Sequence, residues 1–108
     1  MDEVFISLDG IRKKFDEPSI KEKFKGFKRD VQFKFPDIGA AYILKITEEP
    51  TASLTEGTVE APQILVEMDS ATFLGIRTKK ISGAQTYATG KLKIKGSMPD
   101  LLKMQKLM

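Results

Sequence analysis

Cysteine, histidine, tryptophan and asparagine are absent from the 108 residues of this chain. Without cysteine there is no disulfide framework and no thiolate nucleophile. Without histidine the chain also lacks the imidazole of the usual zinc sites and the base of a Ser-His triad. Only carboxylates, lysines, hydroxyls and backbone groups remain for chemistry. We therefore predict a protein that is not an enzyme and that holds no metal and no cofactor.

Long hydrophobic runs are missing as well. No apolar stretch approaches the roughly 20 residues that span a bilayer. The acidic N-terminal segment, residues 1–10, does not have the pattern of a secretory signal. The ending Lys106-Leu-Met108 is not the peroxisomal tripeptide. The sequence predicts a cytoplasmic protein, and its length is that of one domain over residues 1–108.

Several motifs of nucleotide and ester chemistry are also absent. No two glycines stand two positions apart, so there is no dinucleotide fingerprint, and the phosphate loop and the nucleophile elbow are missing too. Adjacent acids occur at Asp2-Glu3, Asp16-Glu17 and Glu48-Glu49. Neighbouring residues point apart on a helix and to opposite faces on a strand. We interpret these pairs as turn or cap residues, not as an acid and base that act together.

The charge is weakly positive, with 18 Lys and Arg against 15 Asp and Glu. Such lysines usually form a solvated face, and the functional alternative is attraction to an anionic membrane or nucleic acid. Phe33 and Phe35 share one face of a predicted strand, with Lys34 between them. A single interleaved charge favours core packing over stacking on RNA. We predict no nucleic-acid partner.

Apolar residues at helical spacing predict two helices near the N-terminus. The first covers residues 3–15, and its stripe consists of Val4, Leu8, Ile11 and Phe15. Pro18 breaks this helix. Ser19 and Glu22 have the spacing of a capping box, so a second, short helix begins there and ends near Gly26.

Alternation of apolar and polar residues predicts the strands. A strand over 31–35 and a turn at 36–39 lead to a hairpin partner over 41–46. In the strand over 91–95, Leu92 and Ile94 face inward. The remaining strands are a weaker one over 51–60 and one over 63–68.

Helical segments lie on both sides of the strand over 91–95. Asp69 and Ser70 offer a cap for a helix over 71–79, and Ser97 begins the capping box of a final helix over 101–108. The small and polar segment 82–89 is either a short helix or a loop. Because most strands are grouped and do not alternate with helices, we expect an α+β fold. Its largely antiparallel five-stranded sheet carries the helices on one face.

The last third of the chain resembles a known family. The resemblance is carried by the segments Asp69-Ser-Ala-Thr-Phe73, Gly90-Lys-Leu-Lys-Ile-Lys-Gly96-Ser-Met98 and Leu101-Leu-Lys-Met-Gln-Lys-Leu107. Their order and content are similar to the closing segment of the sterol carrier protein 2 (sterol-transfer) family. The order of the earlier elements agrees with that family too, although the motifs are specific only from about residue 61 onward. The family often has Gly where this chain has Lys79-Lys80, a departure that concerns the local turn.

The resemblance implies an apolar tunnel between sheet and helices that binds fatty acids, acyl-CoAs, sterols or phospholipids without catalysis. The last helix is apolar on more than one face, which suits both a core helix and a ligand wall. We therefore expect the ligand to contact Phe24, Phe27, Phe73, Ile76, Leu101, Leu102, Met104, Leu107 and Met108. We expect Lys103 and Lys106 to contact an anionic head group or a membrane transiently, with the last helix acting as a lid.

Two other functions stay open at this point. In the first, the apolar groove receives a partner helix or a second copy of the domain, and the protein is an interaction module or homodimer. In the second, the protein acts on acyl-CoA or a lipid as an enzyme. The absence of histidine and cysteine makes this second alternative the weakest.

Overall fold

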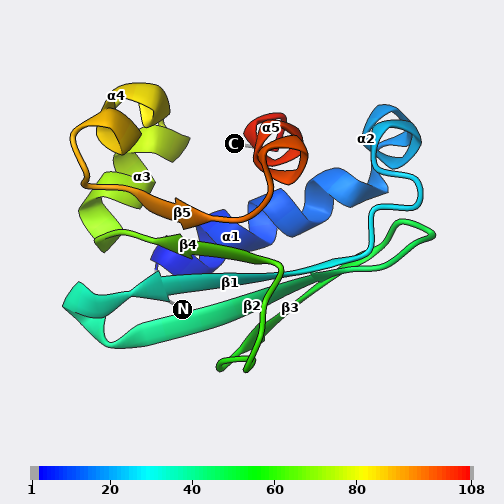
Figure 1. Ribbon diagram of the computed structural model, residues 1–108, viewed down its shortest axis with the longest axis horizontal. Helices are drawn as coiled ribbons and strands as arrows, with labels where there is room; N and C mark the ends of the chain where they lie inside the picture. Colours follow the sequence, from blue (N-terminus) through cyan, green and yellow to red (C-terminus); the bar gives the residue numbers. More distant parts are fainter. Residues whose placement is uncertain (1–2, 108) are drawn as a thin grey trace.

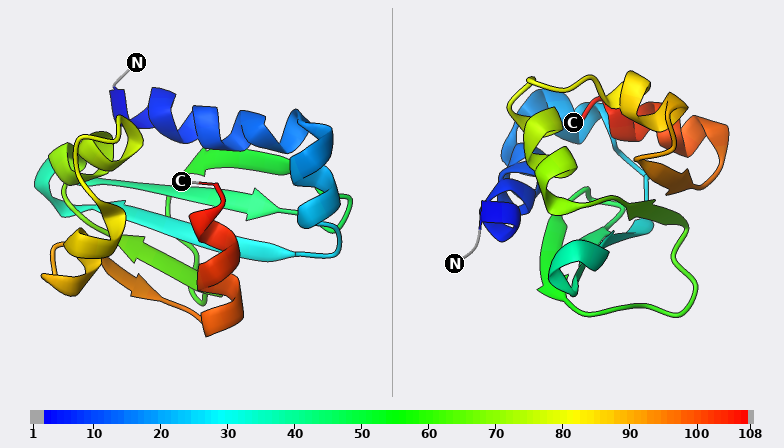
Figure 2. Two further views of the ribbon diagram at one scale, coloured as in Figure 1. Left: turned by 90° about the horizontal axis from the view of Figure 1, so that it is seen from above. Right: turned by 90° about the vertical axis from the view of Figure 1, so that its left-hand side faces the viewer.

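Helices and strands form two layers, which Figure 1 shows from the side and Figure 2 from above and from one end. The structure, a computed structural model, describes residues 3–107. Its strands are β1 (Arg29–Phe35), β2 (Ala40–Ile46), β3 (Ala52–Glu56), β4 (Ile64–Glu67) and β5 (Lys93–Lys95). Its helices are α1 (Glu3–Lys13), α2 (Pro18–Lys23), α3 (Ser70–Arg77), α4 (Gly83–Ala88) and α5 (Met98–Gln105), with 3-10 turns η1 (Lys14–Asp16) and η2 (Pro36–Ile38). These α-helices lie on the same side of the sheet, which confirms the expected α+β class.

The sheet has the strand order β3-β2-β1-β4-β5. The expected hairpin is confirmed, because β1 and β2 pair antiparallel with Phe33 opposite Tyr42. β3 extends the hairpin on one side, and β5 pairs antiparallel with β4 on the other. The single parallel pair, β1 with β4, follows from the segment 57–63, which crosses from the β3 edge to the far side of β1. The sheet is therefore largely antiparallel, as predicted.

The core lies between the sheet and the helices. On β1, Val31, Phe33 and Phe35 are buried toward the helices, as the alternation predicts. On α1 the predicted stripe of Val4, Leu8 and Ile11 is buried, and Phe15 continues it on η1. Burying an apolar side chain of this size contributes about 1.5–3 kcal/mol, so these rows account for much of the cohesion between the two layers.

The other face of the sheet is partly covered by the crossover, segment 57–63. Gln32 points to this face and its side chain is only 1% exposed. Its Nε2 donates to the carbonyl oxygens of Tyr42 and Gly57, each at 3.0 Å, and its Oε1 accepts from the backbone N–H of Val59 at 2.8 Å. One amide side chain thus holds the crossover against the middle of the sheet.

Several boundaries differ from the sequence-based expectation. The second helix begins at Pro18 with Glu17 as its N-cap, so the expected capping box at Ser19 is wrong and the observed cap lies two residues earlier. Proline suits this first helical position because its missing N–H has no partner there anyway. The segment 82–89, for which helix and loop were open, contains α4, capped by the Ser82 hydroxyl. The expected caps Asp69 and Ser97 are confirmed.

The end of α3 explains the departure at Lys79. The backbone N–H of Lys79 donates to the Ile76 carbonyl and that of Lys80 to the Gly75 carbonyl, which is the Schellman pattern of helix termination. This pattern places the residue after the C-cap in the left-handed region, and Lys79 has φ 62°. Glycine adopts this conformation without steric cost, whereas a lysine does not. The chain therefore forms the same turn with a strained backbone at Lys79.

Candidate functional site

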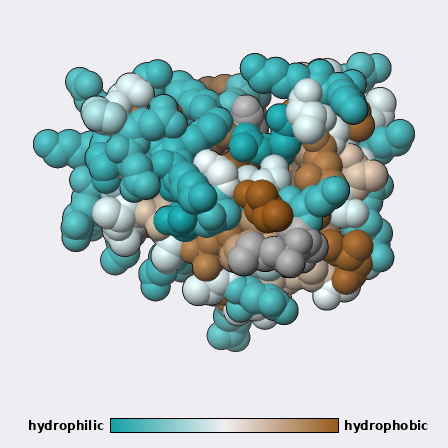
Figure 3. All heavy atoms as spheres, turned by 180° about the vertical axis from the view of Figure 1, so that it is seen from behind, coloured by the Kyte–Doolittle hydropathy of each residue, from teal (hydrophilic) through white to brown (hydrophobic). Residues whose placement is uncertain are grey.

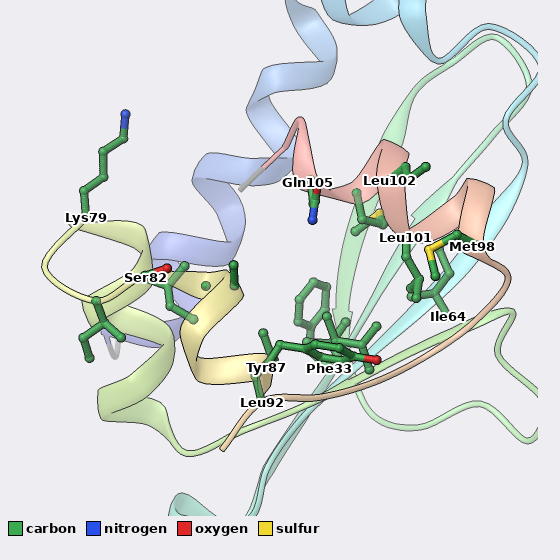
Figure 4. Close-up of a pocket in the computed structure, with 17 residues that line it drawn as sticks. Phe33, Ile64, Lys79, Ser82, Tyr87, Leu92, Met98, Leu101, Leu102 and Gln105 are labelled. Carbon is green, nitrogen blue, oxygen red and sulfur yellow. The ribbon is translucent and has the colours of Figure 1, made fainter. Parts of the chain in front are cut away.

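A cavity of about 650 Å³ separates α4 from α5 and reaches down to the sheet. Figure 4 shows Phe33 and Ile64 at its floor, with Tyr87 on one side and Leu101 on the other. Val66 on β4, Ile94 on β5 and Leu92 just before β5 complete the floor. This volume falls within the range of about 300–1,000 Å³ that holds small-molecule ligands.

Aliphatic and aromatic side chains form most of the lining. Ile76 and Ile81 come from α3 and the turn that follows it, and Met98, Leu102 and Met104 come from α5. The α4 side contributes small residues, Gly83 and Ala84, which leave the space open. Contact between this lining and hydrocarbon is favourable, because both surfaces leave water. The same lining offers few partners for a charged group.

Polar groups stand at the edge of this apolar space. Ser82, Tyr87 and Gln105 are the uncharged ones, and the Gln105 amide points toward the space between the helices. Lys79 carries the one charge among the described lining residues, and its side chain extends away from the cavity. The cavity is therefore apolar inside and can offer hydrogen bonds only where it opens.

The helix α5 is held firmly at its N-terminal end. Arg29 donates from Nε to Asp100 Oδ2 at 2.8 Å and from Nη2 to Asp100 Oδ1 at 3.1 Å, a two-bond ion pair that ties α5 to the start of β1. Farther along, in the last turn of α5, Lys103 donates to the Lys23 carbonyl at 3.0 Å and places its ammonium over the rings of Phe24 and Phe27.

The other end of α5 is held by two cations. Lys14 Nζ donates to the Leu107 carbonyl at 2.8 Å, and Arg77 Nη1 reaches the same oxygen at 3.5 Å. Burial lowers the pKa of Lys14, and the neighbouring charge of Arg77 lowers it further. Burial alone lowers the pKa of Arg77. Within residues 3–107, the hydrogen bonds of α4 stay inside the segment 82–92, and Thr86 is its one buried side chain.

The predicted ligand-contacting residues divide into two groups. Ile76, Leu101, Leu102 and Met104 line the cavity. Phe24, Phe27, Phe73 and Leu107 are buried in the core and do not line it. Met108 lies outside the described residues.

The two predicted head-group lysines also differ. Lys103 is engaged with α2, as described above, and turns its ammonium toward the rings of Phe24 and Phe27. Lys106 is exposed at the C-cap of α5, directly after the lining residue Gln105. Of the two, only Lys106 is exposed.

Sequence reasoning missed the α4 side of the cavity. Tyr87 is the one aromatic residue in an otherwise small and polar segment, and that contrast was the available signal. Ile81 was also missed, because it follows the predicted end of its helix and belongs to no stripe. Gly75 makes room for it, since a Cβ at that position would lie 2.3 Å from Ile81 Cδ1.

Comparisons with known proteins agree with this architecture. The sterol carrier protein domain 2 of Helicoverpa armigera is 20% identical, with 96% of this chain and 84% of that chain covered and a TM-score of 0.74. Palmitated SCP2L2 from Aedes aegypti is 14% identical, with 94% and 89% covered and a TM-score of 0.67. At these identities the likeness concerns the fold.

A third neighbour is a much longer protein. It is a double mutant of the sec-alkylsulfatase PisA1, an enzyme from a Pseudomonas species, at 17% identity and a TM-score of 0.71. The match covers 82% of this chain but only 14% of the sulfatase chain. In that enzyme the shared fold is thus a small part of the whole. No curated protein matches the sequence of this chain.

In residues 3–107 no helix is long and apolar enough to cross a membrane. The family model for the SCP-2 sterol transfer family matches residues 8–108, which is nearly the whole chain. Membership supports lipid binding or transfer as the general role, on a fold that is generally not catalytic. By this match, and in agreement with the fold and the apolar cavity, the chain belongs to the SCP-2 sterol transfer family.

Proposed function

We propose that this domain binds the hydrocarbon part of one lipid in the cavity between α4 and α5, and that it releases the lipid unchanged. The observation that carries the proposal is an apolar space of about 650 Å³ whose polar groups stand only at its edge. A flexible acyl chain fits such a space, because every buried methylene contributes about 0.8 kcal/mol and no polar group is left without a partner.

The energetics allow release as well as binding. About fifteen methylenes yield roughly 12 kcal/mol before costs. Association and ordering offset a large part of this gain, which leaves affinities near the micromolar range. Affinity of this kind selects for length and apolarity more than for identity, so fatty acids, acyl-CoAs, sterols and phospholipids are all candidates. The palmitated state of the Aedes aegypti neighbour supports an acyl chain as the first ligand to test.

The edge of the cavity is the place for the lipid head group. Ser82, Tyr87 and Gln105 offer a hydroxyl, a phenol and an amide where the cavity opens. Such uncharged groups can both donate and accept hydrogen bonds. They suit a carboxyl, an ester or a sterol hydroxyl that remains close to water.

The test is native mass spectrometry of the purified protein, followed by lipid extraction and by titration with palmitate. We expect one lipid per chain, either carried through purification or taken up on addition. The variant Ala84→Trp fills the cavity from α4 and should lose this binding, whereas Ala88→Trp, on the same helix but outside the lining, should keep it. Both alanines are exposed, so the two substitutions should have similar effects on the stability of the fold.

Two outcomes would contradict the proposal. If the wild-type protein neither carries lipid nor binds added palmitate or a fluorescent sterol, the cavity is not a lipid-binding site. Equal binding by the two tryptophan variants would place the ligand elsewhere. A stable dimer in light scattering, together with absent lipid binding, would instead favour the interaction module.

A further inference from the structure

Two half-buried cations meet at the end of α5 without a carboxylate between them. Lys14 on η1 and Arg77 at the end of α3 both reach the carbonyl oxygen of Leu107, at 2.8 Å and 3.5 Å. In residues 3–107 the ion pairs are those of Asp9 and Asp100, so neither cation is paired with an acid. Two positive charges thus converge on one uncharged oxygen.

Both cations keep N–H groups that can bind a further acceptor. Arg77 donates from Nε to Ser7 Oγ at 3.1 Å, but its Nη2 donates to no acceptor within residues 3–107. This Nη2 lies beside Gly10, which places no side chain there, and an added Cβ would be 3.4 Å away. The 3.5 Å contact from Nη1 is long for a hydrogen bond, and Lys14 uses one of its three protons. A guanidinium with free N–H groups beside an ammonium suits a carboxylate or a phosphate.

Lys79 adds a third positive charge to this group. Burial lowers the pKa of Lys14, the charges of Arg77 and Lys79 lower it further, and the charge of Glu17 acts in the opposite direction. We call Lys14, Arg77 and Lys79 the cation cluster. One acid and one helix end, which supplies about half a negative charge, leave roughly one to two positive charges over. A phosphate monoester carries about 1.5 to 2 negative charges at neutral pH, so it matches the cluster better than a monoanion does.

The cation cluster borders the cavity. Lys79 itself lines the cavity, and Arg77 directly follows the lining residue Ile76. The Leu107 carbonyl comes two residues after Gln105, whose amide points toward the space between the helices (Figure 4). Hydrophilic side chains cover most of the side of the molecule on which α1 lies, and hydrophobic ones are confined to a smaller area (Figure 3). A ligand can therefore keep a charged end at the cluster, near water, while its hydrocarbon chain occupies the cavity.

We propose that the cation cluster binds the phosphate of a phosphomonoester lipid whose hydrocarbon chain lies in the cavity, an assignment that rests on the proposed lipid binding. Arg77 donates to the phosphate oxygens from Nη1 and Nη2, Lys14 adds a hydrogen bond from its ammonium, and Lys79 adds attraction from the edge of the cavity. A sterol or a fatty alcohol lacks this charge, and a fatty acid carries about half of it. The cluster thus ranks lipids by the charge of the polar end, which the apolar lining does not distinguish.

The test compares three ligands that share one chain and differ at the polar end: hexadecyl phosphate, palmitate and hexadecanol. Equilibrium dialysis of the full chain at about pH 8, where a phosphomonoester is a dianion, gives the three dissociation constants below the micelle concentrations. We expect hexadecyl phosphate to bind about 30-fold more tightly than hexadecanol, because a hydrogen bond to a charged group contributes at least about tenfold. Palmitate should bind about fivefold more tightly than the alcohol, because Coulomb energy is proportional to charge.

Matched variants assign this preference to the cluster. Lys14→Gln/Arg77→Gln removes two of its charges, and the control Lys25→Gln/Lys28→Gln removes two exposed charges between α2 and β1. The cluster variant should reduce the preference for hexadecyl phosphate over hexadecanol to below about threefold, whereas the control should keep it, because its charges are screened. Arg77→Lys keeps the charge without the planar fork and should retain about tenfold. Equal losses in the cluster variant and the control would overturn the proposal.

Hexadecanol shows whether a variant still forms the cavity. Its binding should be the same in the wild type and in Lys14→Gln/Arg77→Gln, because the alcohol carries no charge. If that variant loses hexadecanol as well, Lys79→Gln decides the matter, since Lys79 is exposed and its side chain makes no hydrogen bond or ion pair within residues 3–107. This single change should lower the preference for hexadecyl phosphate by about threefold, and an unchanged preference would contradict the proposal.

Inorganic phosphate distinguishes a lipid head group from a free ion. An excess of it should weaken the binding of hexadecyl phosphate and leave that of hexadecanol unchanged. If inorganic phosphate and hexadecanol bind together while hexadecyl phosphate has no advantage, the cluster takes a free ion and the proposal fails. Equal affinities for the three ligands would show that Lys14 and Arg77 only hold the end of α5, which contradicts the phosphate site alone. Failure of all three ligands to bind would instead contradict the proposed lipid binding itself.

Discussion

Gln32 offers the sharpest test of how the far face of the sheet is held. The substitution Gln32→Met keeps the approximate length of the side chain and removes its hydrogen bonds to Tyr42, Gly57 and Val59. Each such bond contributes about 1 kcal/mol net, and the added apolar burial offsets a part of the loss. We expect the free energy of unfolding to fall by about 2–3 kcal/mol, a large fraction of the about 5–15 kcal/mol of a typical domain.

Urea unfolding measures this change as a lower midpoint with an unchanged slope. In thermal unfolding the same loss should lower Tm by about 10–20 °C, at about 4–8 °C per kcal/mol for a domain near this size. Lys34→Met is the control, because Lys34 is exposed on the same face of β1. Its effect should stay within about 0.5 kcal/mol. A loss below about 1 kcal/mol for Gln32→Met would refute the account of the crossover.

The variant Gln32→Glu adds a dependence on pH. The introduced carboxyl would be buried and would face the carbonyl oxygens of Tyr42 and Gly57, so its pKa should rise above the usual value of about 4.3. The protonated form can donate a hydrogen bond, whereas the ionised form is repelled. The variant should therefore lie closest to the wild type at low pH and lose stability as pH rises through and above 4.3. A deficit that does not change with pH would show that this carboxyl does not titrate against those carbonyls.

The remaining predictions concern helix ends. Lys79→Gly should raise the stability by about 1 kcal/mol in urea unfolding, because it removes a strained left-handed residue. No gain would mean that the strain is absent. Asp69→Ala should cost about 1 kcal/mol at neutral pH by removing the bond from the Thr72 N–H. That bond lowers the Asp69 pKa, so the deficit should shrink as pH falls below the usual value of about 4 and vanish once pH is below the lowered pKa of the folded state. A deficit that does not shrink as pH falls would contradict the cap. A double-mutant cycle of Arg29→Met and Asp100→Asn should give a coupling of about 1–2 kcal/mol, since one partner is buried and the other partly exposed, and additive effects would argue against the ion pair.

The fold could be predicted well from local patterns. Most strands and helices follow from periodicity or from a cap, such as Asp69 before α3 and Ser97 before α5, whereas α4 was left open between helix and loop. The burial of Gln32 could not be predicted, because it depends on a crossover that covers the far face of the sheet and not on anything within β1. From the sequence, Gln32 and Lys34 are equivalent outward positions, yet the first is buried and the second exposed.

The site could be predicted only in part, for a related reason. Helical spacing identifies residues that face the core, but it does not distinguish a packed core from the wall of a cavity. Phe24 and Phe73 share this spacing with Ile76, yet the two phenylalanines pack against other aromatic rings and Ile76 lines the cavity. The missed residue Tyr87 stands on a helix of six residues, too short for any stripe to be visible.

The central position of β1 also has a consequence for synthesis of the chain. β1 receives β2 from the N-terminal half and β4 from the C-terminal half, which is completed later. Until residues 64–67 arrive, one side of β1 is a bare strand edge beside the apolar row Val31, Phe33 and Phe35. At about 5–20 residues per second, the ribosome leaves this edge exposed for seconds. Bare apolar edges pair readily with other chains. The nascent domain should therefore depend on early chaperone contact with residues 29–35, a dependence that pulse-labelled crosslinking to stalled chains of increasing length can map.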